Sequence, residues 1–296
     1  MFGISRREMR RRLTGVMLMT PALLVLALLI FYPVIWSMII SLHHNRSVMT
    51  GDYIFVGLDN YVRMLTHPQF ITAIQNTLMF VVATVILELI FGFYLAVTLN
   101  KRLPGTSFFR MVYVMPMMMA SIAAGFIWRL IFVDGNGVLN WMLNQIGITS
   151  ITWFANATAA RFMVLMSSLW GSLPFSILVL LAGLKSVPDD YYEAAQLDGA
   201  SAWQRFTRIT VPLMKNTITL VVIVRVSDAF RIYDQIVALT GGGPGHATSS
   251  ITHLIFRRTF EDMRFGEGAA SSFIMLAIVG VSCLLIFKAF RLGSDD

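Results

Sequence analysis

EAAQLDGAS, residues 193–201, separates two long apolar segments of this chain, and ITVP, residues 209–212, follows it closely. The first apolar segment ends near Gly183, and the second begins near Leu213. A stretch this polar suits neither a protein core nor a membrane span. We therefore expect residues 184–212 to form an exposed loop between two membrane-spanning helices.

The loop contains the signals of two short helices. Both residues at 189–190 are aspartates, which interact favourably with the helix dipole in the first turn of a helix. Gly199 is expected to end this helix, because glycine is a poor helix former. Ser201-x-x-Gln204 matches a capping box and predicts the start of a second helix. Between these signals, the small alanines at 194–195 leave room for another protein to approach closely.

The same loop resembles the cytoplasmic EAA loop of binding-protein-dependent ABC transporter permeases, in which Glu-Ala-Ala is followed by three residues, a glycine and a downstream Ile-x-x-Pro. Further motifs of the maltose-type sugar permeases occur in the expected order: Gly57-Leu58-x-Asn60-Tyr61, Asn76-Thr77, Leu139-Asn140, Ala182-Gly183-Leu184 and Leu239-Thr240-x-Gly242-Gly243-Pro244. Together these motifs extend the resemblance over nearly the whole chain.

The resemblance implies an all-α, polytopic integral membrane protein with six transmembrane helices and the ABC type I importer permease fold. The expected function is that of a permease subunit in an ATP-driven importer, where it forms half of the translocation pathway for a sugar or related carbohydrate. The expected location is a bacterial inner membrane. Because the chain stops at Asp296 without a glycine-lysine-glycine extension, it is more similar to the maltose-F-like half of such heterodimers.

The resemblance also implies partners. These are a second permease subunit, an ABC ATPase dimer, a periplasmic or lipid-anchored solute-binding protein, the carbohydrate and membrane lipid. The ATPase binds ATP and magnesium, so no cofactor, metal or catalytic residue is expected in this chain. The residues expected to couple to the ATPase are Glu193, Ala194, Ala195, Asp198, Gly199 and Ala200. Those expected to contact the binding protein are Gly242, Gly243 and Pro244.

Composition independently indicates a membrane protein. Of the 296 residues, 56% are hydrophobic and 13% are charged, whereas soluble domains have about 25% charged residues. The net charge of +7 does not predict a nucleic-acid partner, because Lys and Arg cluster at the ends of apolar segments instead of on one face. The single cysteine, Cys283, lies in an apolar segment and cannot form an intrachain disulfide.

Six apolar segments are long enough to cross a bilayer, which requires about 20 residues. They are residues 15–41, 72–99, 107–132, 160–183, 213–239 and 269–290. Loops rich in Lys and Arg favour the cytoplasmic side. These residues are concentrated in the N-terminal tail, around Lys101 and Arg102, and in the 184–212 loop. Both termini and this loop are therefore expected in the cytoplasm.

The fifth segment contains charges that membrane spans rarely tolerate. Arg225, Asp228, Arg231 and Asp234 recur at every third residue, which in one helix places neighbours within ion-pair distance. Each unpaired charge would cost about 2.5–3.5 kcal/mol at the bilayer centre. For the same reason Glu88, in the second segment, is expected to pair with another helix or subunit. Two interpretations stay open, a structural ladder of ion pairs and a polar wall of the substrate path. The path candidates here are Arg231, Tyr233 and Asp234.

The fourth segment contains WGSLPFS, residues 170–176, whose glycine and proline predict a kink. An aromatic ring beside hydroxyl groups suits a sugar, so Trp170, Ser172 and Phe175 are further candidates for the substrate path. Packing of another helix through Gly171 and Ser172 explains the same residues.

Two other functional classes stay open at this point. An ion-coupled secondary transporter would explain the charges of the fifth segment, but not an exposed loop of this form. A membrane-embedded enzyme would need a catalytic cluster, and no His, Cys or carboxylate group has a nucleophile or metal-ligand spacing. The glycine-rich sequence at residues 241–248 lacks the lysine of a phosphate-binding loop. ATP hydrolysis is therefore expected in another polypeptide.

Overall fold

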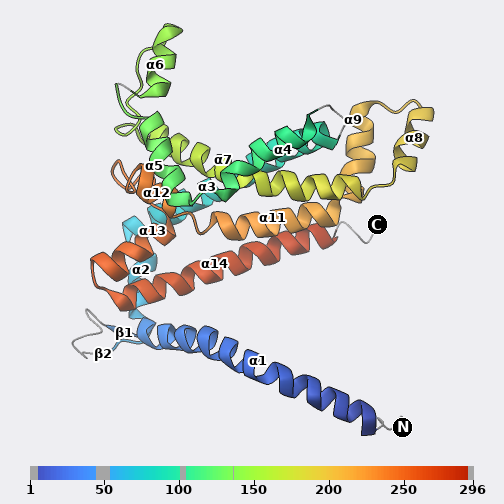
Figure 1. The fold of residues 1–296 in the computed structure, drawn as a ribbon. Coiled ribbons are helices and arrows are strands. Elements are labelled where there is room, and N and C mark those ends of the chain that lie inside the picture. The colour runs from blue at the N-terminus through green and yellow to red at the C-terminus, as the bar shows by residue number, and fades with distance from the viewer. Residues whose placement is uncertain (1–5, 45–53, 101–104, 136, 293–296) are drawn as a thin grey trace.

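The computed structural model describes residues 6–44, 54–100, 105–135 and 137–292, which are almost entirely helical (Figure 1). The first elements are α1 (Arg6–Ser41), β1 (His43–His44), β2 (Ile54–Phe55), α2 (Asp59–Thr66), α3 (Pro68–Asn100), α4 (Thr106–Val114), the 3-10 helix η1 (Met115–Met118), α5 (Ser121–Ile131), α6 (Val138–Gln145) and α7 (Ala157–Lys185). They are followed by α8 (Asp189–Leu197), α9 (Ala202–Arg205), the π-helix η2 (Phe206–Thr210), α10 (Val211–Leu213), α11 (Lys215–Ala229), α12 (Asp234–Leu239), α13 (Ile251–Phe256), the π-helix η3 (Arg257–Glu261) and α14 (Phe265–Leu292).

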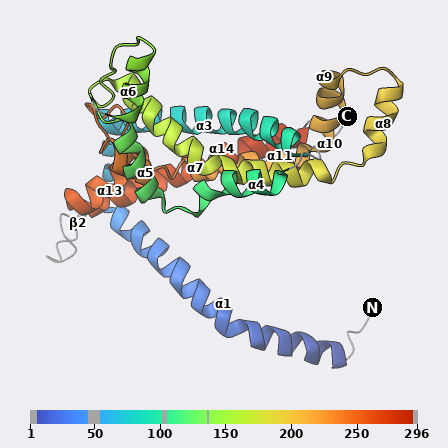
Figure 2. The ribbon, with the colours of Figure 1, turned by 45° about the horizontal axis from the view of Figure 1, so that its top comes forward.

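Four helices are long and apolar enough to cross a membrane unbroken: α1, α3, α7 and α14. Helices α3, α7, α11 and α14 form the body of the molecule, in which α3 packs along α7 and α11 packs along α14 (Figures 1 and 2). Helix α1 diverges from this bundle and contacts it mainly through α14. Most of the apolar surface of α1 is therefore left exposed.

The main apolar core lies between α3, α7 and α11, with α14 packed against it. Val81 and Val85 of α3 pack with Leu180 and Leu181 of α7 and with Val221 of α11. The opposite face of α3 is equally apolar but exposed, as expected for a helix surrounded by lipid, and it carries Val82, Ile86 and Ile90.

The prediction of one continuous span at residues 107–132 is wrong. The two helical parts of this segment, on either side of residues 119–120, meet at 107°. Pro116 has no N–H for a helical hydrogen bond, and residues 119–120 adopt an extended backbone conformation. Helix α5 therefore leaves in a new direction and packs against α12.

The prediction of one continuous span at residues 213–239 is also wrong. The helical run bends by 72° just after Pro212, which again lacks an N–H, and α11 then ends at Ala229. At about 1.5 Å per residue, the 15 residues of α11 reach only part of the way across a hydrocarbon core of about 30 Å. We therefore expect the break at residues 230–233 to lie within the depth of the membrane.

The two ends of the bundle carry different elements (Figures 1 and 2). The beginning of α1, the end of α14 and helices α8 to α10 lie at one end, called the inner end below. The β1–β2 hairpin, α2, α6 and α13 lie at the opposite, outer end. This arrangement fits an even number of membrane crossings. Lys101 and Arg102, which contribute to the expected orientation, lie outside the described residues.

Candidate functional site

Two charges from different helices form a buried ion pair inside the bundle. Arg225 of α11 donates to Glu88 of α3 through two hydrogen bonds, Nε to Oε2 at 2.7 Å and Nη2 to Oε1 at 3.0 Å. Glu88 is 1% exposed and Arg225 is 9% exposed. This two-point geometry is the strong form of a guanidinium–carboxylate contact. The prediction that Glu88 bonds to another helix is confirmed.

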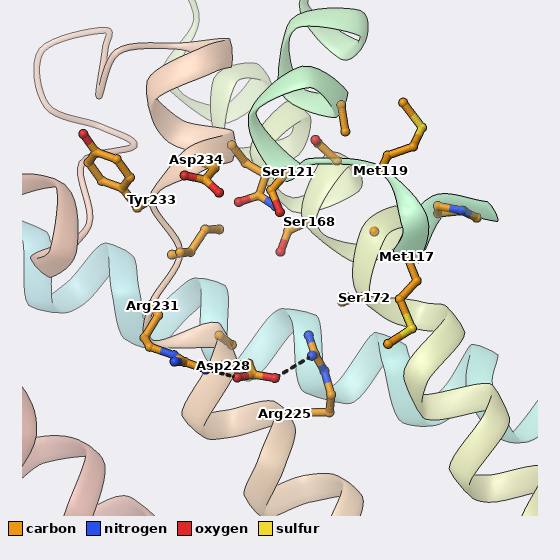
Figure 3. A pocket seen from close by; sticks show the side chains of 17 residues that line it. Met117, Met119, Ser121, Ser168, Ser172, Arg225, Asp228, Arg231, Tyr233 and Asp234 are labelled. Carbon is orange, nitrogen blue, oxygen red and sulfur yellow. Dashed lines mark hydrogen bonds and ion pairs between the residues drawn. The ribbon is translucent and has the colours of Figure 1, made fainter. Parts of the chain in front are cut away.

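The ion pair continues into a short chain of alternating charges. Nη1 of Arg225 lies 3.1 Å from Oδ2 of Asp228, whose other oxygen accepts from Arg231 (Figure 3). The predicted ladder is therefore correct as far as Arg231. It is wrong for Asp234, which follows the helix break and forms no ion pair within the described part of the chain.

A cavity of about 500 Å³ opens beside this chain of charges (Figure 3). Its walls come from η1 and α5, from α7, and from the residues between the end of α11 and the start of α12. The volume falls in the range of about 300–1,000 Å³ that is usual for small-molecule sites. The two breaks in the membrane helices thus frame a space large enough for a ligand.

The lining of the cavity is rich in hydrogen-bonding groups. Its polar members are Ser121, Ser167, Ser168, Ser172, Arg225, Asp228, Arg231, Tyr233, Asp234 and Gln235. Its apolar members are Pro116, Met117, Met119, Ala124, Gly171, Ala229 and Ile232. Nowhere in the described ranges do three or more His, Cys, Asp or Glu side chains gather to hold a metal ion. The chemistry offered to a ligand is therefore hydrogen bonding and charge.

Serine hydroxyls of α7 link the cavity to the buried ion pair. Ser172 and Ser176 both donate to the carboxylate of Glu88, Ser176 at 3.0 Å. Ser167 is 2% exposed, and its hydroxyl has no hydrogen-bond partner among the described residues. A Cβ placed on Gly171 would have no atom within 4 Å. Of the helix packing predicted through Gly171 and Ser172, the structure thus shows the contact of Ser172 with α3, whereas Gly171 borders the cavity.

The candidates for the substrate path do not all reach the cavity. The four that line it are Ser172, Arg231, Tyr233 and Asp234. The ring of Tyr233 packs against Phe256 of α13 with the ring centroids 5.2 Å apart. Phe256 therefore already takes up part of the surface of this ring.

The two other aromatic candidates, both on α7, lie outside the lining. Trp170 makes an edge contact with Trp128 of α5, with the ring centroids 6.1 Å apart. Phe175 lies 5.9 Å from the guanidinium carbon of Arg225 and covers it from one side. Both aromatic residues thus support the wall, and neither is placed at its surface.

Apart from the ladder residues Arg225 and Asp228, four polar residues of the lining were not among the predicted candidates: Ser121, Ser167, Ser168 and Gln235. Ser168 precedes Ser172 by four residues, so their shared helix face was an available signal. Ser121 and Gln235 stand directly after the two breaks, and a continuous helix would have placed them elsewhere. The proline at 116 was the sequence signal for the first break.

The 184–212 loop forms a knob at the inner end, as Figure 1 shows. The predicted capping box is confirmed, since Oε1 of Gln204 accepts from the N–H of Ser201 at 2.7 Å and the serine hydroxyl accepts from Gln204 in return. Gly199 has a φ of +75°, and a Cβ there would meet no atom within 4 Å, so it serves the turn. Of the coupling candidates, Glu193, Ala194, Asp198 and Gly199 are exposed and Ala195 and Ala200 are half-buried.

The knob is fixed to the bundle through its second half. Phe206 packs edge-on against Phe93 of α3, with centroids 5.5 Å apart. The hydroxyls of Tyr192 in α8 and Thr210 in η2 lie 2.9 Å apart. The π-helix η2, a type of turn that is frequent at functional sites, joins the knob to α10 and α11.

The glycine-rich sequence at residues 241–248 forms a firmly held loop at the outer end. A Cβ on Gly242, whose φ is +88°, would lie 2.7 Å from the ring of His253. Thr248 is 0% exposed, and its hydroxyl lies 2.9 Å from the carbonyl of Gly243. Of the predicted binding-protein contacts, Gly242 is buried, and Gly243 and Pro244 are half-buried.

Residues 88–292 match the family of the binding-protein-dependent transport system inner membrane component. The chain belongs to this family. It is 35% identical over 291 residues to the trehalose/maltose transport system permease protein MalF of Thermococcus litoralis, covering 98% of each chain. It is 31% identical over 289 residues to the trehalose transport system permease protein SugA of Mycobacterium tuberculosis, covering 98% of this chain and 92% of that one.

A solved structure shares the fold. It is that of a bacterial alginate ABC transporter in complex with an alginate pentasaccharide-bound periplasmic protein, with a TM-score of 0.81 at 22% identity, covering 95% of this chain and 94% of that chain. The predicted all-α importer permease fold is thereby confirmed. The chain is a multi-pass transport component and not a catalytic subunit, and these relatives give no support to an ion-coupled secondary transporter.

Proposed function

We propose that this chain is one of two permease subunits in an ATP-driven importer and that it forms half of the pathway for a sugar. The observation that carries the proposal is the cavity of about 500 Å³ between broken membrane helices, with its lining of hydroxyl groups and charges. Sugars present many hydroxyl groups, which such side chains can bond as donors and acceptors. Relatives named for trehalose and maltose transport support the same substrate class.

The balance of charge at the cavity favours a neutral sugar. Arg225 is bonded to Glu88, and Arg231 is bonded to Asp228. Asp234 adds a carboxylate that has no ion-pair partner in the described part of the chain. Both guanidinium groups at the cavity thus have carboxylate partners, so the wall offers little to an acidic sugar.

The partners follow from the two ends of the molecule. The inner end faces the cytoplasm in this proposal, and an ABC ATPase dimer docks on the exposed knob of residues 184–212. A second permease completes the cavity on the side where the Arg231 side chain is 70% exposed. The solute-binding protein delivers the sugar at the outer end, near Gly243 and Pro244.

Sugar uptake by the reconstituted importer tests the pathway. Asp234→Ala is expected to lower ATP-dependent uptake of maltose or trehalose in proteoliposomes and to leave assembly and basal ATP hydrolysis largely intact. Asp59→Ala is the matched control, because this exposed carboxylate lies at the outer end, away from the cavity. The proposal would be contradicted if sugar uptake continues without the ATPase. It would also be contradicted if the Asp234→Ala variant takes up sugar at the unchanged rate.

Thiol labelling tests the orientation. Single cysteines at Ala200 and Gly245, in a Cys283→Ser background, are expected to react from opposite sides of the membrane. Labelling from the same side would remove the basis for docking the ATPase on the knob.

Gly199→Asp is expected to uncouple ATP hydrolysis from transport in an assembled complex, because aspartate is strained at a φ of +75°.

A further inference from the structure

The break between α11 and α12 is held by two hydroxyl groups from further along the chain. The hydroxyl of Ser250 donates to the carbonyl of Ile232 at 2.7 Å, and that of Thr252 donates to the carbonyl of Phe230 at 3.1 Å. Phe230 is 1% exposed and Ile232 is 6% exposed. Irregular backbone at membrane depth persists only where such groups find partners, and these two hydroxyls supply them.

Ser250 is itself held in place from both sides. It is 0% exposed, and its oxygen also accepts from the N–H of His253 at 3.1 Å, which caps α13. The next residue, Ile251, donates its N–H to the hydroxyl of Thr77 in α3 at 2.9 Å. Because the Ser250 hydroxyl both donates and accepts, its position relative to the break is fixed.

The same anchoring extends to the glycine-rich loop. Asn76 of α3 donates to the carbonyls of His246 and Ser249 at 3.0 and 3.1 Å. Arg161 of α7 donates to the carbonyl of Ala247 at 3.0 Å. The outer loop, the start of α13 and the helix break are thus one continuous hydrogen-bonded unit.

We propose that Ser250 and Thr252 are positioning residues that set the cavity wall and connect it to the outer loop. The break that they hold carries Arg231 and Asp234 into the lining. A displacement of the loop at residues 241–249 therefore moves these two side chains. The role in transport rests on the proposed function. When a loaded binding protein docks on the loop, the displacement of the loop then shifts Arg231 and Asp234 in the cavity wall.

The test measures the accessibility of a cysteine in the cavity. Gln235→Cys reports on the wall behind the break, and Ser121→Cys reports on the opposite wall, each in the full Cys283→Ser chain assembled with its partner subunits in membranes. Thr252→Val and Ser250→Ala are each expected to raise the rate at which a methanethiosulfonate reagent labels Gln235→Cys. The expected rise is about fivefold, as for the loss of one net hydrogen bond, and Ser121→Cys should not change.

Matched controls separate this effect from general loosening. Ser271→Ala removes an equally buried hydroxyl, but one that donates to Glu267 within its own helix at 2.7 Å. Thr252→Ser keeps the hydroxyl and should give the labelling rate of the unsubstituted chain. If Ser250→Ala fails to fold, Thr252→Val still tests the proposal, because valine keeps the shape of the threonine side chain. The proposal would be overturned if neither Ser250→Ala nor Thr252→Val changes the labelling rate of Gln235→Cys. It would also be overturned if the labelling rate of Ser121→Cys rises equally in these variants, or if Ser271→Ala raises the labelling rate of Gln235→Cys equally. Labelling does not require transport, so a wild-type complex that takes up no sugar counts against the proposed function alone.

Discussion

The two breaks that frame the cavity are built in opposite ways. The break at residues 119–120 follows Pro116, and no side chain of the described residues donates to its carbonyls. The break at residues 230–233 is bonded through hydroxyls from α13 and lies next to the ion pair of Arg225. Backbone geometry makes the first break, whereas long-range hydrogen bonds make the second.

This difference separates an adaptable wall, formed by η1 and residues 119–121, from a fixed wall, formed by residues 225–235. The adaptable wall carries methionines, and Met118 is 82% exposed and Met117 is 54% exposed. Thioether side chains are unbranched and adjust easily to new neighbours. We therefore expect the methionine side chains to shift more readily than the residues of the fixed wall.

The largest expected effect comes from removing one partner of the buried ion pair in the fixed wall. Arg225→Met leaves Glu88 buried and uncompensated, which is expected to cost about 3–5 kcal/mol and most of the assembled complex. Size-exclusion chromatography of the detergent-solubilised complex measures this loss. Arg257→Met is the control, because its partner Glu261 is 58% exposed and is not left buried.

A double variant sharpens this prediction. Glu88→Leu together with Arg225→Met removes both charges, so it is expected to recover a large part of the yield lost with Arg225→Met alone. A double variant that assembles no better than the single variant would show that the charges themselves, and not the burial of an unpaired one, are required.

The same contrast shows what the sequence could predict. Apolar segments of more than about 20 residues have few solutions in lipid, so the positions of α1, α3, α7 and α14 follow from composition. Contacts between Arg225, Asp228 and Arg231 are local, and their spacing predicts them. The adaptable wall also had a local signal, the proline at 116.

The partners that the fixed wall takes from other elements could not be predicted, because these contacts join distant parts of the chain. Arg225 and Glu88 are 137 residues apart, and Ser250 and Ile232 are 18 residues apart. The periodicity of the fifth segment does not predict that the hydroxyls of Ser250 and Thr252 bond to its carbonyls. Asp234 was therefore placed on the same helix as Arg225, although it begins the next one.

The second prediction concerns the contact between the elements that follow the two breaks. A Cβ on Gly125 of α5 would lie 2.5 Å from the Cβ of Ala238 in α12. Gly125→Ala is therefore expected to cost about 1–3 kcal/mol by overpacking, seen as a lower unfolding temperature in detergent. Adding Ala238→Gly should restore the stability. Gly171→Ala is the control, since space is open there, and an equal loss in both single variants would refute close packing of α5 on α12.

The third prediction tests whether the two walls move independently. Pro116→Ala restores an N–H in the adaptable wall, where the neighbouring methionine side chains are exposed, and should change stability by less than about 1 kcal/mol. It is expected to alter the labelling of Ser121→Cys and to leave that of Gln235→Cys unchanged, the reverse of the pattern for Thr252→Val. Met117→Leu, which keeps the proline, is the control. Equal changes at both cysteines would show that the walls are coupled.

The last expected effect is a response to acid beside the fixed wall. His253 is 5% exposed, and its Nδ1 lies 3.0 Å from the Ser249 hydroxyl. Burial, reinforced by the charge of Arg257, lowers the pKa of His253 from its usual 6.5. Burial and the charge of Arg258 likewise lower the pKa of His67.

The sign of the response follows from these directions. Above pH 6.5 both rings are neutral in the folded and the unfolded chain, so neither affects stability. As the pH falls below 6.5, the unfolded chain takes up protons that the folded chain resists, and each ring lowers the stability by at most about 1.4 kcal/mol per pH unit until its lowered pKa is reached. His253→Gln is expected to shrink the difference in unfolding temperature between about pH 7.5 and about pH 5.5. Part of the difference should remain, because His67 still takes up a proton on unfolding in acid. His44→Gln, a half-buried control away from the loop, should leave the difference unchanged. Since the sequence between residues 106 and 121 contains no histidine or carboxylate, an acid response that survives in a chain carrying both His253→Gln and His67→Gln would mean that acid acts on a group other than these two histidines and outside the adaptable wall.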